Sequence, residues 1–389
     1  MKKKFKHPLS TSSWDNEEII ALNNVISNGQ FTMGKEVKKF EKNFANFFKS
    51  KYAIMVNSGS SANLLMIASL FYTKRNPLKK GDEVIVPAVS WSTSYFPLFQ
   101  YGLKIKFVDI DLYTLNYDLN SLKKAISNKT KLILAVNLLG NPNNFDEINH
   151  MIEKKNIQVV EDNCESMGAK FDNKMTGTFG RLGTFSTFFS HHMSTMEGGL
   201  VITDDEELYH ILLCLRAHGW TRDLPKKNKL KVNISNDKFK ESFRFILPGY
   251  NLRPLEMSGA IGSEQLKKLK SFIKIRRKNA DYFKQVLKGN TNIIIQKEIG
   301  KSSWFGFSLL INPNSKLSRN ELLNKLYKLG IECRPIVTGN FANNPVVNYF
   351  DYSIHSKLKN SNYVDANGLF IGNHHYDISH IIEKLSMIR

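Results

Sequence analysis

The segment from residue 186 to residue 203 concentrates side chains that could move protons and bind an anion. It contains the adjacent histidines His191 and His192, several hydroxyl groups and the glycine pair Gly198-Gly199. An unperturbed imidazole has a pKa of about 6.5 and can therefore gain or lose a proton near neutral pH. A glycine pair lets the backbone pass close to a ligand. A hairpin with two solvated histidines is the alternative interpretation of this segment taken alone.

Two short strands must position this segment. Residues 184–189 alternate between polar and apolar, which is typical of a half-buried strand, and residues 199–203 form a second apolar run. The acidic residues 204–207 then mark the start of a helix. We therefore expect the two histidines in a loop between strands.

Other predicted strands end in residues that could contact a ligand. The runs 83–86, 105–108, 132–136 and 157–161 alternate with helical segments, which predicts a mainly parallel sheet with helices on both faces. Ligands of such sheets bind at the carboxyl ends of the strands. The residues at those ends include Trp91, Asn137 and Asp162.

The turn after residues 52–56 has the features of a phosphate-binding site. This apolar run leads into the hydroxyl-rich residues 57–63 at the head of the apolar helix 64–72. Backbone N–H groups and the helix dipole bind phosphate at such a helix N-terminus. A serine N-cap would explain Ser60 or Ser61 singly, but not the whole cluster.

Composition limits the class of protein. A chain of 389 residues with 42% hydrophobic and 23% charged residues is typical of a globular protein with two lobes. No apolar run approaches the roughly 20 residues of a membrane helix, so we expect a cytoplasmic protein without membrane contact. The three scattered cysteines, Cys164, Cys214 and Cys333, build neither a disulfide framework nor a four-cysteine metal site, and we predict no metal.

The formal net charge of +20 favours an anionic partner. Nucleic acid is one candidate, but the lysines are dispersed and no nucleic-acid-binding motif accompanies them, so we expect none. A positive field would equally attract a nucleotide-linked sugar. Charge alone does not choose between these ligands.

The chain changes character near residue 250. A long basic helix over 256–287 precedes strand-like runs at 293–296 and 304–311 and a helix near 319–329. This pattern predicts a large domain over residues 1–250 and a smaller α+β domain over residues 251–389. The polar stretch 226–237 is expected to be a mobile loop.

Four sequence blocks together resemble one family. They are residues 56–62 (Val-Asn-Ser-Gly-Ser-Ser-Ala), 160–166 (Val-Glu-Asp-Asn-Cys-Glu-Ser), 249–253 (Gly-Tyr-Asn-Leu-Arg) and 260–266 (Ala-Ile-Gly-Ser-Glu-Gln-Leu). The chain resembles the sugar-nucleotide branch of the aspartate-aminotransferase fold type from Gly29 to about Asn373. The resemblance implies pyridoxal-phosphate fold type I, with a mainly parallel seven-stranded sheet in the large domain.

One position departs from the aminotransferases of that branch. Their lysine that binds pyridoxal phosphate covalently corresponds to His191 here, and imidazole cannot form that bond. Together with residues 215–222, this histidine resembles the branch of 3-dehydratases that act on GDP-linked 4-keto-6-deoxy sugars. A related branch uses a four-cysteine iron–sulfur cluster, which three scattered cysteines exclude.

This resemblance implies a complete reaction. Pyridoxal 5'-phosphate or pyridoxamine 5'-phosphate would be the cofactor, L-glutamate the amino donor, and GDP-4-keto-6-deoxy-D-mannose or a GDP-heptose analogue the substrate. The C3 hydroxyl would be lost, giving a 4-keto-3,6-dideoxy sugar for a surface polysaccharide. A homodimer with shared active sites is implied as well.

The resemblance also assigns roles residue by residue. His191 would be the catalytic acid–base group, and His192 would orient the loop. The cofactor would be bound by Gly59, Ser60, Trp91, Asp162, Glu165, Ser186 and, from the neighbouring subunit, Asn251. The substrate would contact His218, Arg253 and Glu332.

Two other functions stay open on the sequence. The chain could be a true aminotransferase that uses another lysine, such as Lys170 or Lys174, although both fall outside the matching block. It could also be an inactive relative that binds nucleotide sugars. Against the inactive relative, Asp162, Trp91 and Ser186 stand where cofactor chemistry requires them.

Overall fold

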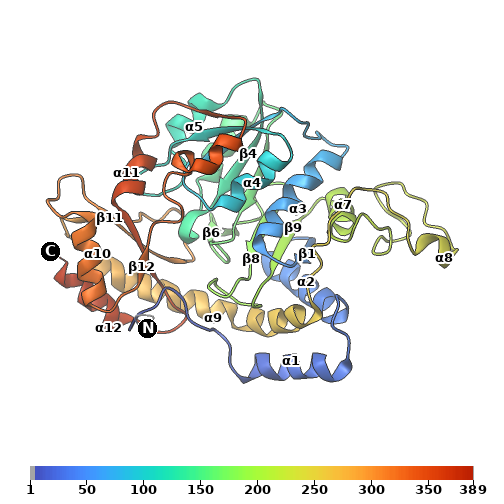
Figure 1. The fold of residues 1–389 in the computed structure, drawn as a ribbon, viewed down its shortest axis with the longest axis horizontal. Coiled ribbons are helices and arrows are strands. Elements are labelled where there is room, and N and C mark those ends of the chain that lie inside the picture. Colours follow the sequence, from blue (N-terminus) through green and yellow to red (C-terminus); the bar gives the residue numbers. More distant parts are fainter. Residues whose placement is uncertain (1–4, 389) are drawn as a thin grey trace.

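A mixed sheet of eight strands forms the centre of the computed structural model, which describes residues 5–388 (Figure 1). The spatial order of the strands is β1 (Tyr52–Val56), β9 (Gly199–Thr203), β8 (Gly183–Ser186), β5 (Gln158–Asp162), β4 (Thr130–Val136), β2 (Glu83–Pro87), β3 (Lys104–Val108) and β13 (Tyr352–Ile354). Strand β9 pairs antiparallel with β1 and β8, and the pairs from β8 to β13 are parallel. The predicted mainly parallel α/β sheet is therefore confirmed.

The sheet has one strand more than the seven expected. The additional strand, β13, comes from the last tenth of the chain and pairs with β3 at the edge of the sheet, with Tyr352 opposite Ile105. Its three residues are exposed and lack the apolar pattern that marks a buried strand, so sequence periodicity gave no sign of it. The C-terminal part of the chain thus contributes to the large sheet, and the domain boundary at residue 250 stays a prediction.

Helices cover both faces of this sheet. Ile54 and Val56 of β1 belong to a core shared with α3 (Gly59–Tyr72), α4 (Ser92–Gln100) and α7 (Glu206–Arg216). On the opposite face lie α2 (Lys35–Phe48) and α9 (Glu256–Val286), beside α5 (Leu119–Ala125) and α6 (Phe145–Ile152).

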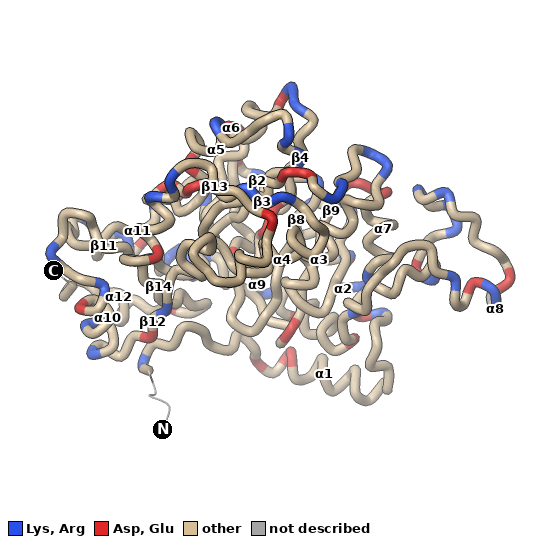
Figure 2. Tube along the Cα trace, turned by 45° about the horizontal axis from the view of Figure 1, so that its top comes forward, with Lys and Arg blue, Asp and Glu red and all other residues tan. Residues whose placement is uncertain are grey.

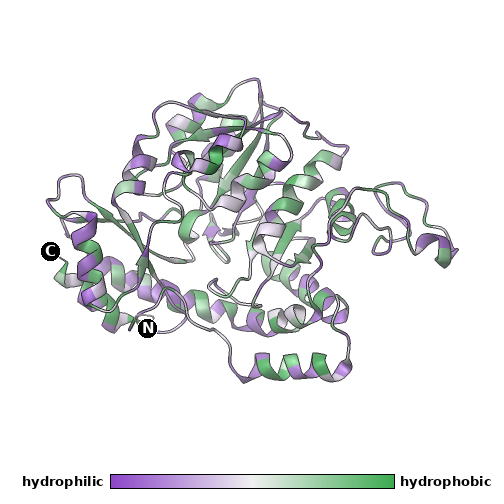
Figure 3. Cartoon of the chain, viewed as in Figure 1, coloured by the Kyte–Doolittle hydropathy of each residue, from purple (hydrophilic) through white to green (hydrophobic). Residues whose placement is uncertain are grey.

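The apolar stripe of α2 explains its position. Val37, Phe40, Phe44 and Phe48 recur at helical spacing and are almost fully buried against β1, β8 and α9. Burying each such side chain contributes roughly 1.5–3 kcal/mol. Figure 3 shows hydrophobic and hydrophilic residues alternating along the helices around the sheet.

A second sheet forms the smaller α+β part. Its strands, in spatial order, are β10 (Ile293–Ile295), β11 (Gly306–Ile311), β14 (Gly368–Gly372) and β12 (Cys333–Arg334). They share a separate hydrophobic core with the C-terminal half of α9, α10 (Arg319–Lys328) and α12 (Ser379–Ile382). Because α9 contributes to both cores, this 31-residue helix joins the two parts of the molecule.

The N-terminal helix α1 (Asn16–Asn28) packs along α9 through a buried carboxylate. Glu18 is fully buried and accepts hydrogen bonds from Lys268 Nζ and from Gln265 Nε2, at 2.8 Å and 2.7 Å. The remaining short elements are β6 (Lys170–Phe171), β7 (Lys174–Met175), α8 (Lys238–Glu241), α11 (Lys359–Asn367) and the 3₁₀ turns at Leu138–Gly140, Phe341–Asn343, Pro345–Tyr349 and Glu383–Met387.

Residues 217–252 form an arm that leaves the body after α7. Figure 1 shows this arm, with α8 at its tip, projecting away from the sheet. At its base, Tyr250 N–H donates to the Leu215 carbonyl and Leu252 N–H donates to the Arg216 carbonyl. Lysines and arginines recur along the arm (Figure 2), and its residues 226–237 contain neither helix nor strand. No helix within residues 5–388 is both long and apolar enough to span a membrane.

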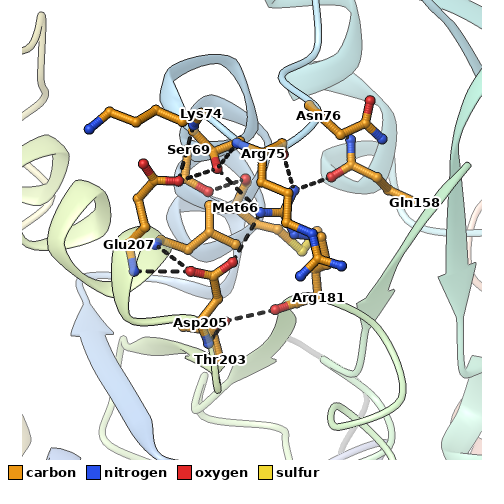
Figure 4. Close-up of polar contacts among 12 residues, drawn as sticks. Met66, Ser69, Lys74, Arg75, Asn76, Gln158, Arg181, Thr203, Asp205 and Glu207 are labelled. Carbon is orange, nitrogen blue, oxygen red and sulfur yellow. Dashed lines mark hydrogen bonds and ion pairs between the residues drawn. The ribbon is translucent and has the colours of Figure 1, made fainter. Parts of the chain in front are cut away.

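A polar network closes the end of the sheet opposite the carboxyl ends of its parallel strands (Figure 4). Arg181, between β5 and β8, donates from Nη1 to the Arg75 carbonyl at 2.9 Å and to the Gln158 side chain. From Nη2 it donates to Thr73 Oγ1 at 3.2 Å and to Asp205 Oδ2 at 3.1 Å. Asp205 also caps α7. This arginine therefore ties α3, β5 and α7 together.

Candidate active site

A cavity of about 320 Å³ lies at the carboxyl ends of the parallel strands. Val136 ends β4, Asp162 ends β5 and Ser186 ends β8, and all three line the cavity. The turns after β1 and β2 complete this wall. Residues from five separate strand ends thus meet at one place, as the sequence pattern predicted.

One end of the cavity is built to bind an anion. Ser58 caps α3 by accepting a hydrogen bond from Ser61 N–H at 3.0 Å, and the helix begins at Gly59 rather than at Leu64 as expected. Gly59 and Ser60 therefore occupy the first turn, whose N–H groups have no partner within the helix. A Cβ at Gly59 would lie 2.5 Å from Ser186 Cβ, so only glycine fits here. Gly59, Ser60 and Ser186 all line the cavity.

Asp162 sits at the centre of a buried hydrogen-bond network. Its Oδ2 accepts from Asn63 Nδ2 at 2.8 Å and from Ser94 Oγ at 2.7 Å, and its Oδ1 accepts from the Cys164 N–H at 3.0 Å. Thr184 Oγ1 in turn donates to Asn63 Oδ1 at 2.6 Å. These donors fix the carboxylate in one orientation. The sequence pattern identified Asp162 but not Asn63 or Ser94.

Trp91 and Glu165 lie on the remaining walls. Trp91 stands at the start of α4 and is 51% exposed, so a face of its indole is available to a flat ligand. Glu165 Oε2 accepts a hydrogen bond from the Leu139 N–H at 3.1 Å. Burial raises the pKa of Glu165, and the positive charge of Arg334 opposes that rise.

His191 lies in the loop between β8 and β9, as predicted, and lines the cavity. The neck of this loop is closed by its own residues, because Thr187 N–H donates to the Gly198 carbonyl at 2.9 Å and Thr195 N–H donates to the Thr187 carbonyl at 2.8 Å. The side chain of His191 makes no hydrogen bond within residues 5–388, and its Nδ1 is buried. The imidazole is thus held by the loop and by ring contacts with Phe188 and Phe305.

The electrostatic surroundings keep His191 neutral. Burial, followed by the positive charges of Arg334 and Arg276, lowers the pKa of His191 to about 3. An imidazole with this pKa is unprotonated at neutral pH and can accept a proton. Both arginines come from the C-terminal part of the chain, so no motif around His191 could have indicated this shift.

His192 has a different environment. Its Nε2 donates to the Ser303 carbonyl at 3.1 Å, and the side chain is buried outside the cavity lining. Burial lowers its pKa well below the ordinary value. The loop is also fixed beyond His192, since Trp14 Nε1 donates to the Ser194 carbonyl at 3.0 Å and Ser194 N–H donates to Gln265 Oε1 at 3.0 Å. These contacts join the loop to the N-terminal segment and to α9.

Arg334 is a cavity residue that the sequence analysis did not select. It extends from β12 with its guanidinium 4.7 Å from the Phe370 ring, and it has neither a hydrogen bond nor an ion pair in the described part of the chain. Glu332, predicted to contact the substrate, lies two residues earlier but does not line the cavity. Its Oε2 instead accepts from the Leu9 N–H at 2.9 Å. The two residues are close in sequence, and only the strand geometry decides which of them faces the cavity.

The remaining predicted residues lie away from this cavity, on the arm. Asn251 is exposed and accepts a hydrogen bond at Oδ1 from Arg253 Nε at 3.0 Å. His218 lies across the base of the arm, where its N–H bonds to the Tyr250 carbonyl at 2.6 Å. The structure therefore brings Gly59, Ser60, Trp91, Asp162, Glu165, Ser186 and His191 together, and it separates His218, Asn251, Arg253 and Glu332 from them.

The residues of the cavity fit pyridoxal or pyridoxamine phosphate. The α3 N-terminus with Ser186 matches a phosphate group, the fixed carboxylate of Asp162 matches a protonated pyridine nitrogen, and the exposed indole of Trp91 matches a flat ring. Two polar groups in the wall, His191 Nδ1 and Arg334 Nε, are buried without protein partners. Such groups are costly to leave unpaired, which is expected where a ligand completes the site.

Comparisons with known proteins agree with this geometry. Residues 12–380 match the model of the DegT/DnrJ/EryC1/StrS aminotransferase family. The chain is 61% identical over 380 residues to the GDP-4-keto-6-deoxy-D-mannose 3-dehydratase of Escherichia coli O55:H7, covering 97% of this chain and 98% of the relative. It is also 61% identical over 379 residues to the enzyme of that name from Yersinia pseudotuberculosis, covering 97% and 96%.

A solved structure is equally similar. The crystal structure of GDP-4-keto-6-deoxymannose-3-dehydratase with a trapped PLP-glutamate geminal diamine superimposes with a TM-score of 0.97. The two chains are 60% identical, and the match covers 98% of this chain and 100% of the other.

Proposed function

The chain belongs to the DegT/DnrJ/EryC1/StrS aminotransferase family, and from that premise we propose that it is a coenzyme B6-dependent 3-dehydratase of GDP-4-keto-6-deoxy-D-mannose. The product is the 4-keto-3,6-dideoxy sugar, and L-glutamate is the amino donor. In overall balance the sugar loses one oxygen atom while glutamate becomes 2-oxoglutarate and ammonia. The sugar is destined for a surface polysaccharide, and the reaction is cytoplasmic.

One observation favours dehydration over amino transfer. Among the described residues, the cavity is lined by the imidazole of His191 and by no lysine. Lys170 and Lys174, the alternatives considered for an aminotransferase, lie in the short hairpin of β6 and β7 outside the cavity. Lys174 Nζ stands 4.7 Å from the Phe179 ring. No described lysine is therefore placed to bind the cofactor covalently.

We assign the cofactor-binding roles to the residues that line the cavity. When bound, pyridoxamine phosphate supplies an amine and an electron-withdrawing ring. The first turn of α3 and Ser186 would bind its phosphate, and Trp91 would stack on its ring. Asp162, fixed by Asn63 and Ser94, would keep the pyridine nitrogen protonated. Glu165 would guide cofactor or glutamate.

His191 would move the proton in the dehydration. Its neutral imidazole can take a proton at a ring nitrogen and return it to the departing C3 hydroxyl. In the free protein its pKa of about 3 makes it a weak base. Anionic ligands in the cavity would offset the charges of Arg334 and Arg276, and so would raise this pKa toward the range that suits acid–base catalysis.

The residues on the arm are assigned to a second subunit. Asn251 is exposed and cannot serve the cavity of its own chain from where it lies, so it would complete the phosphate site of a partner in a two-fold dimer. His218 and Arg253 would contact the partner's substrate. Glu332 would join the substrate contacts of its own cavity, next to Arg334. Full activity in a verified monomer would contradict the shared site.

Product analysis tests this function. The protein is incubated with pyridoxal phosphate, glutamate and a panel of 4-keto nucleotide sugars, including GDP-linked hexose and heptose, and the products are weighed. Loss of one oxygen from the GDP-hexose identifies the substrate. A 4-amino sugar as the main product would contradict dehydration.

Borohydride treatment separates the two chemistries independently of turnover. With His191 in place of lysine, the reduced holoenzyme should retain no pyridoxyl group on the protein. A stable mass increase on a lysine would contradict the proposed function.

A further inference from the structure

The buried amide of Gln265 links helix α9 to the loop that carries His191. Its Oε1 accepts hydrogen bonds from the Ser194 N–H at 3.0 Å and from Ser13 Oγ at 2.7 Å. Its Nε2 donates to the Ser13 carbonyl at 3.1 Å and to Glu18 Oε1 at 2.7 Å. An amide group offers two acceptor sites and two donors, and all four are used here. Because the side chain is also fully buried, it is fixed in one position.

Glu18 determines which way this amide points. Its carboxylate is fully buried and pairs with Lys268 Nζ, which lies 2.8 Å from each carboxylate oxygen. A carboxylate accepts hydrogen bonds and donates none, so it requires the NH₂ group of Gln265 on its side. The amide oxygen must then face Ser194. Figure 1 shows α1, which carries Glu18, beside the first half of α9.

A second side chain binds the carbonyl of the same loop residue. Trp14 Nε1 donates to the Ser194 carbonyl at 3.0 Å, so both main-chain groups of Ser194 are bonded to side chains distant in sequence. Ser194 is buried and follows His191 by three residues. The neck of the loop is closed by its own residues, whereas these two bonds attach the loop to α9 and to the N-terminal segment.

We propose that Gln265 is a positioning residue for the dehydration, assisted by Trp14. Through their bonds to Ser194, the two side chains set where the loop holds the His191 imidazole. This inference rests on the proposed function, which gives His191 the acid–base role. Gln265 belongs to residues 260–266, one of the four blocks on which the family resemblance rests, and none of the roles assigned above falls in that block.

His191 depends on the loop because its own side chain is not anchored by hydrogen bonds. In the described part of the chain, the imidazole makes no hydrogen bond and packs on the rings of Phe188 and Phe305. The loop backbone therefore decides where the ring nitrogens lie. Without the Gln265 amide, the buried Ser194 N–H loses its partner, and the loop moves to restore one. A misplacement of about 1 Å can slow a reaction about 100-fold, even when its origin is remote from the chemistry.

Gln265→Met tests the proposal in the holoenzyme, because methionine has a similar length and lacks the amide. We expect kcat to fall by about 10- to 100-fold, while the KM for the sugar and the affinity for pyridoxal phosphate stay unchanged. Amide hydrogen exchange, followed by mass spectrometry, should become faster in residues 187–196 and not in the rest of the large sheet. A purely structural role would instead accelerate exchange throughout the chain.

Asn279 provides a matched control on the same helix. It is a buried amide whose Nδ2 donates to Asn373 Oδ1 at 3.1 Å and to the Tyr376 carbonyl at 2.9 Å, and neither partner belongs to the His191 loop. Asn279→Leu should therefore lower stability while leaving kcat and the exchange of the loop near their wild-type values. Equal losses of kcat in Asn279→Leu and Gln265→Met would overturn the proposal.

Trp14→Phe removes the other bond to Ser194 with a smaller change. It keeps an aromatic ring and loses only the N–H, so kcat should fall by about 3- to 10-fold, the loss expected from one neutral hydrogen bond. This variant carries the test if Gln265→Met does not fold. Wild-type kcat together with wild-type exchange of residues 187–196, in whichever variant is folded, would overturn the proposal.

The exchange measurement separates the positioning role from the proposed function. If the protein transfers an amino group to the sugar instead of dehydrating it, the proposed function fails. Faster exchange of the loop and a lower kcat for that transfer in Gln265→Met would still support the positioning role. A protein that dehydrates its sugar equally well with and without the Gln265 amide would overturn the positioning role alone.

Discussion

Arg181 lies at the end of the large sheet that is opposite the cavity, and Arg334 lies beside the cavity. The two side chains differ in how many of their hydrogen-bond donors have a partner in the chain. Arg181 donates four hydrogen bonds to Thr73, Arg75, Gln158 and Asp205, at the end of the sheet opposite the carboxyl ends of its parallel strands (Figure 4). Arg334 borders the cavity and makes none within residues 5–388. The two guanidinium groups have the same chemistry, and the Nε of each is buried without a partner, but only the terminal nitrogens of Arg181 form hydrogen bonds within the fold.

The number of hydrogen bonds that a buried polar group makes within the chain distinguishes a structural group from one that is left for a ligand. An unpaired polar group costs roughly 1–3 kcal/mol when it is buried. At Arg181 only Nε lacks a partner, because both terminal nitrogens donate hydrogen bonds, whereas in the described part of the chain the cavity wall leaves His191 Nδ1 and Arg334 Nε without partners and offers the terminal nitrogens of Arg334 none. The chain thus tolerates a cost at the cavity that a bound ligand can remove.

The largest expected effect comes from replacing His191, the unpaired imidazole at the cavity. His191→Lys should reduce elimination by about 10²–10⁴-fold, the contribution typical of an acid–base group. It should also permit covalent retention of pyridoxal phosphate, which borohydride reduction and mass measurement detect.

His192→Asn is the matched change next to it. The shorter amide loses the bond from Nε2 to the Ser303 carbonyl, but main-chain hydrogen bonds of Thr187 and Thr195 still hold the loop, so we expect the variant to retain most activity. If His192→Asn lost more activity than His191→Lys, His192 would be the catalytic base.

The two arginines should respond in opposite ways to the same substitution. Arg334→Met should lower kcat/KM by about 10- to 100-fold, the loss expected from one charged hydrogen bond, with little change in unfolding. Arg181→Met should destabilise the fold by about 1–3 kcal/mol because Asp205 loses its half-buried partner, while the folded fraction keeps its kcat. Denaturant unfolding measures the stability of both variants, and steady-state kinetics measures their kcat and kcat/KM. Equal losses of stability in the two variants would contradict the assignment of Arg181 to the fold and of Arg334 to the site.

Arg334→Met should also change the pH profile. The charge of Arg334 lowers the pKa of His191, so its removal should raise that pKa and move the acidic limb of kcat/KM to higher pH. Arg334→Lys keeps the charge and should leave the limb in place. A limb that moves to lower pH in Arg334→Met would contradict the role of His191 as the base.

A smaller effect is expected from two buried serines that differ only in what they bind. Ser94 Oγ donates to the Asp162 carboxylate at 2.7 Å, and Ser69 Oγ donates to the Met66 carbonyl at 2.7 Å. Ser94→Ala should weaken pyridoxal phosphate binding by about 3- to 10-fold and alter its visible absorbance, because one bond that orients Asp162 is lost. Ser69→Ala should change neither the affinity nor the spectrum. Identical results for the two variants would show that Ser94 is only structural.

The smallest effect concerns a histidine that the fold does satisfy. His374 Nε2 lies 3.0 Å from the Pro8 carbonyl, and burial together with His7 and Arg276 lowers its pKa to about 3. Unfolded histidine titrates at about 6.5, so the unfolded chain binds more protons between these values. Stability should therefore fall as the pH drops below 6.5, by at most about 1.4 kcal/mol per pH unit for this residue. Denaturant unfolding of His374→Gln should show a shallower dependence over this range, and an unchanged slope would contradict the assignment.

The sequence predicted the features that depend on local pattern. The strand end at Asp162 and the loop with His191 follow from runs of a few residues, whereas β8 ends at Ser186 instead of residue 189 and α3 is capped by Ser58 instead of Ser60 or Ser61. The α/β class followed from the alternation of such runs. Each of these inferences required only that parallel strands place their carboxyl ends together.

Features that depend on distant parts of the chain were not predictable in this way. The exposed strand β13 joins the large sheet because it pairs with β3, not because of its own composition. Arg334 reaches the cavity across more than 140 residues from His191, and the chemistry of Asp162 depends on an amide from α3 and a hydroxyl from α4. Tertiary contacts set these positions, and the hydrophobic periodicity of the sequence does not indicate such contacts.

The closed neck of the His191 loop has a consequence for how such enzymes diverge. Thr187, Thr195 and Gly198 hold the loop through main-chain hydrogen bonds, and the side chain at position 191 contributes none. Natural selection can therefore exchange the residue at this position without rebuilding its support. A codon change at position 191 alone therefore leaves the main-chain support of the loop intact, whichever side chain the new codon specifies.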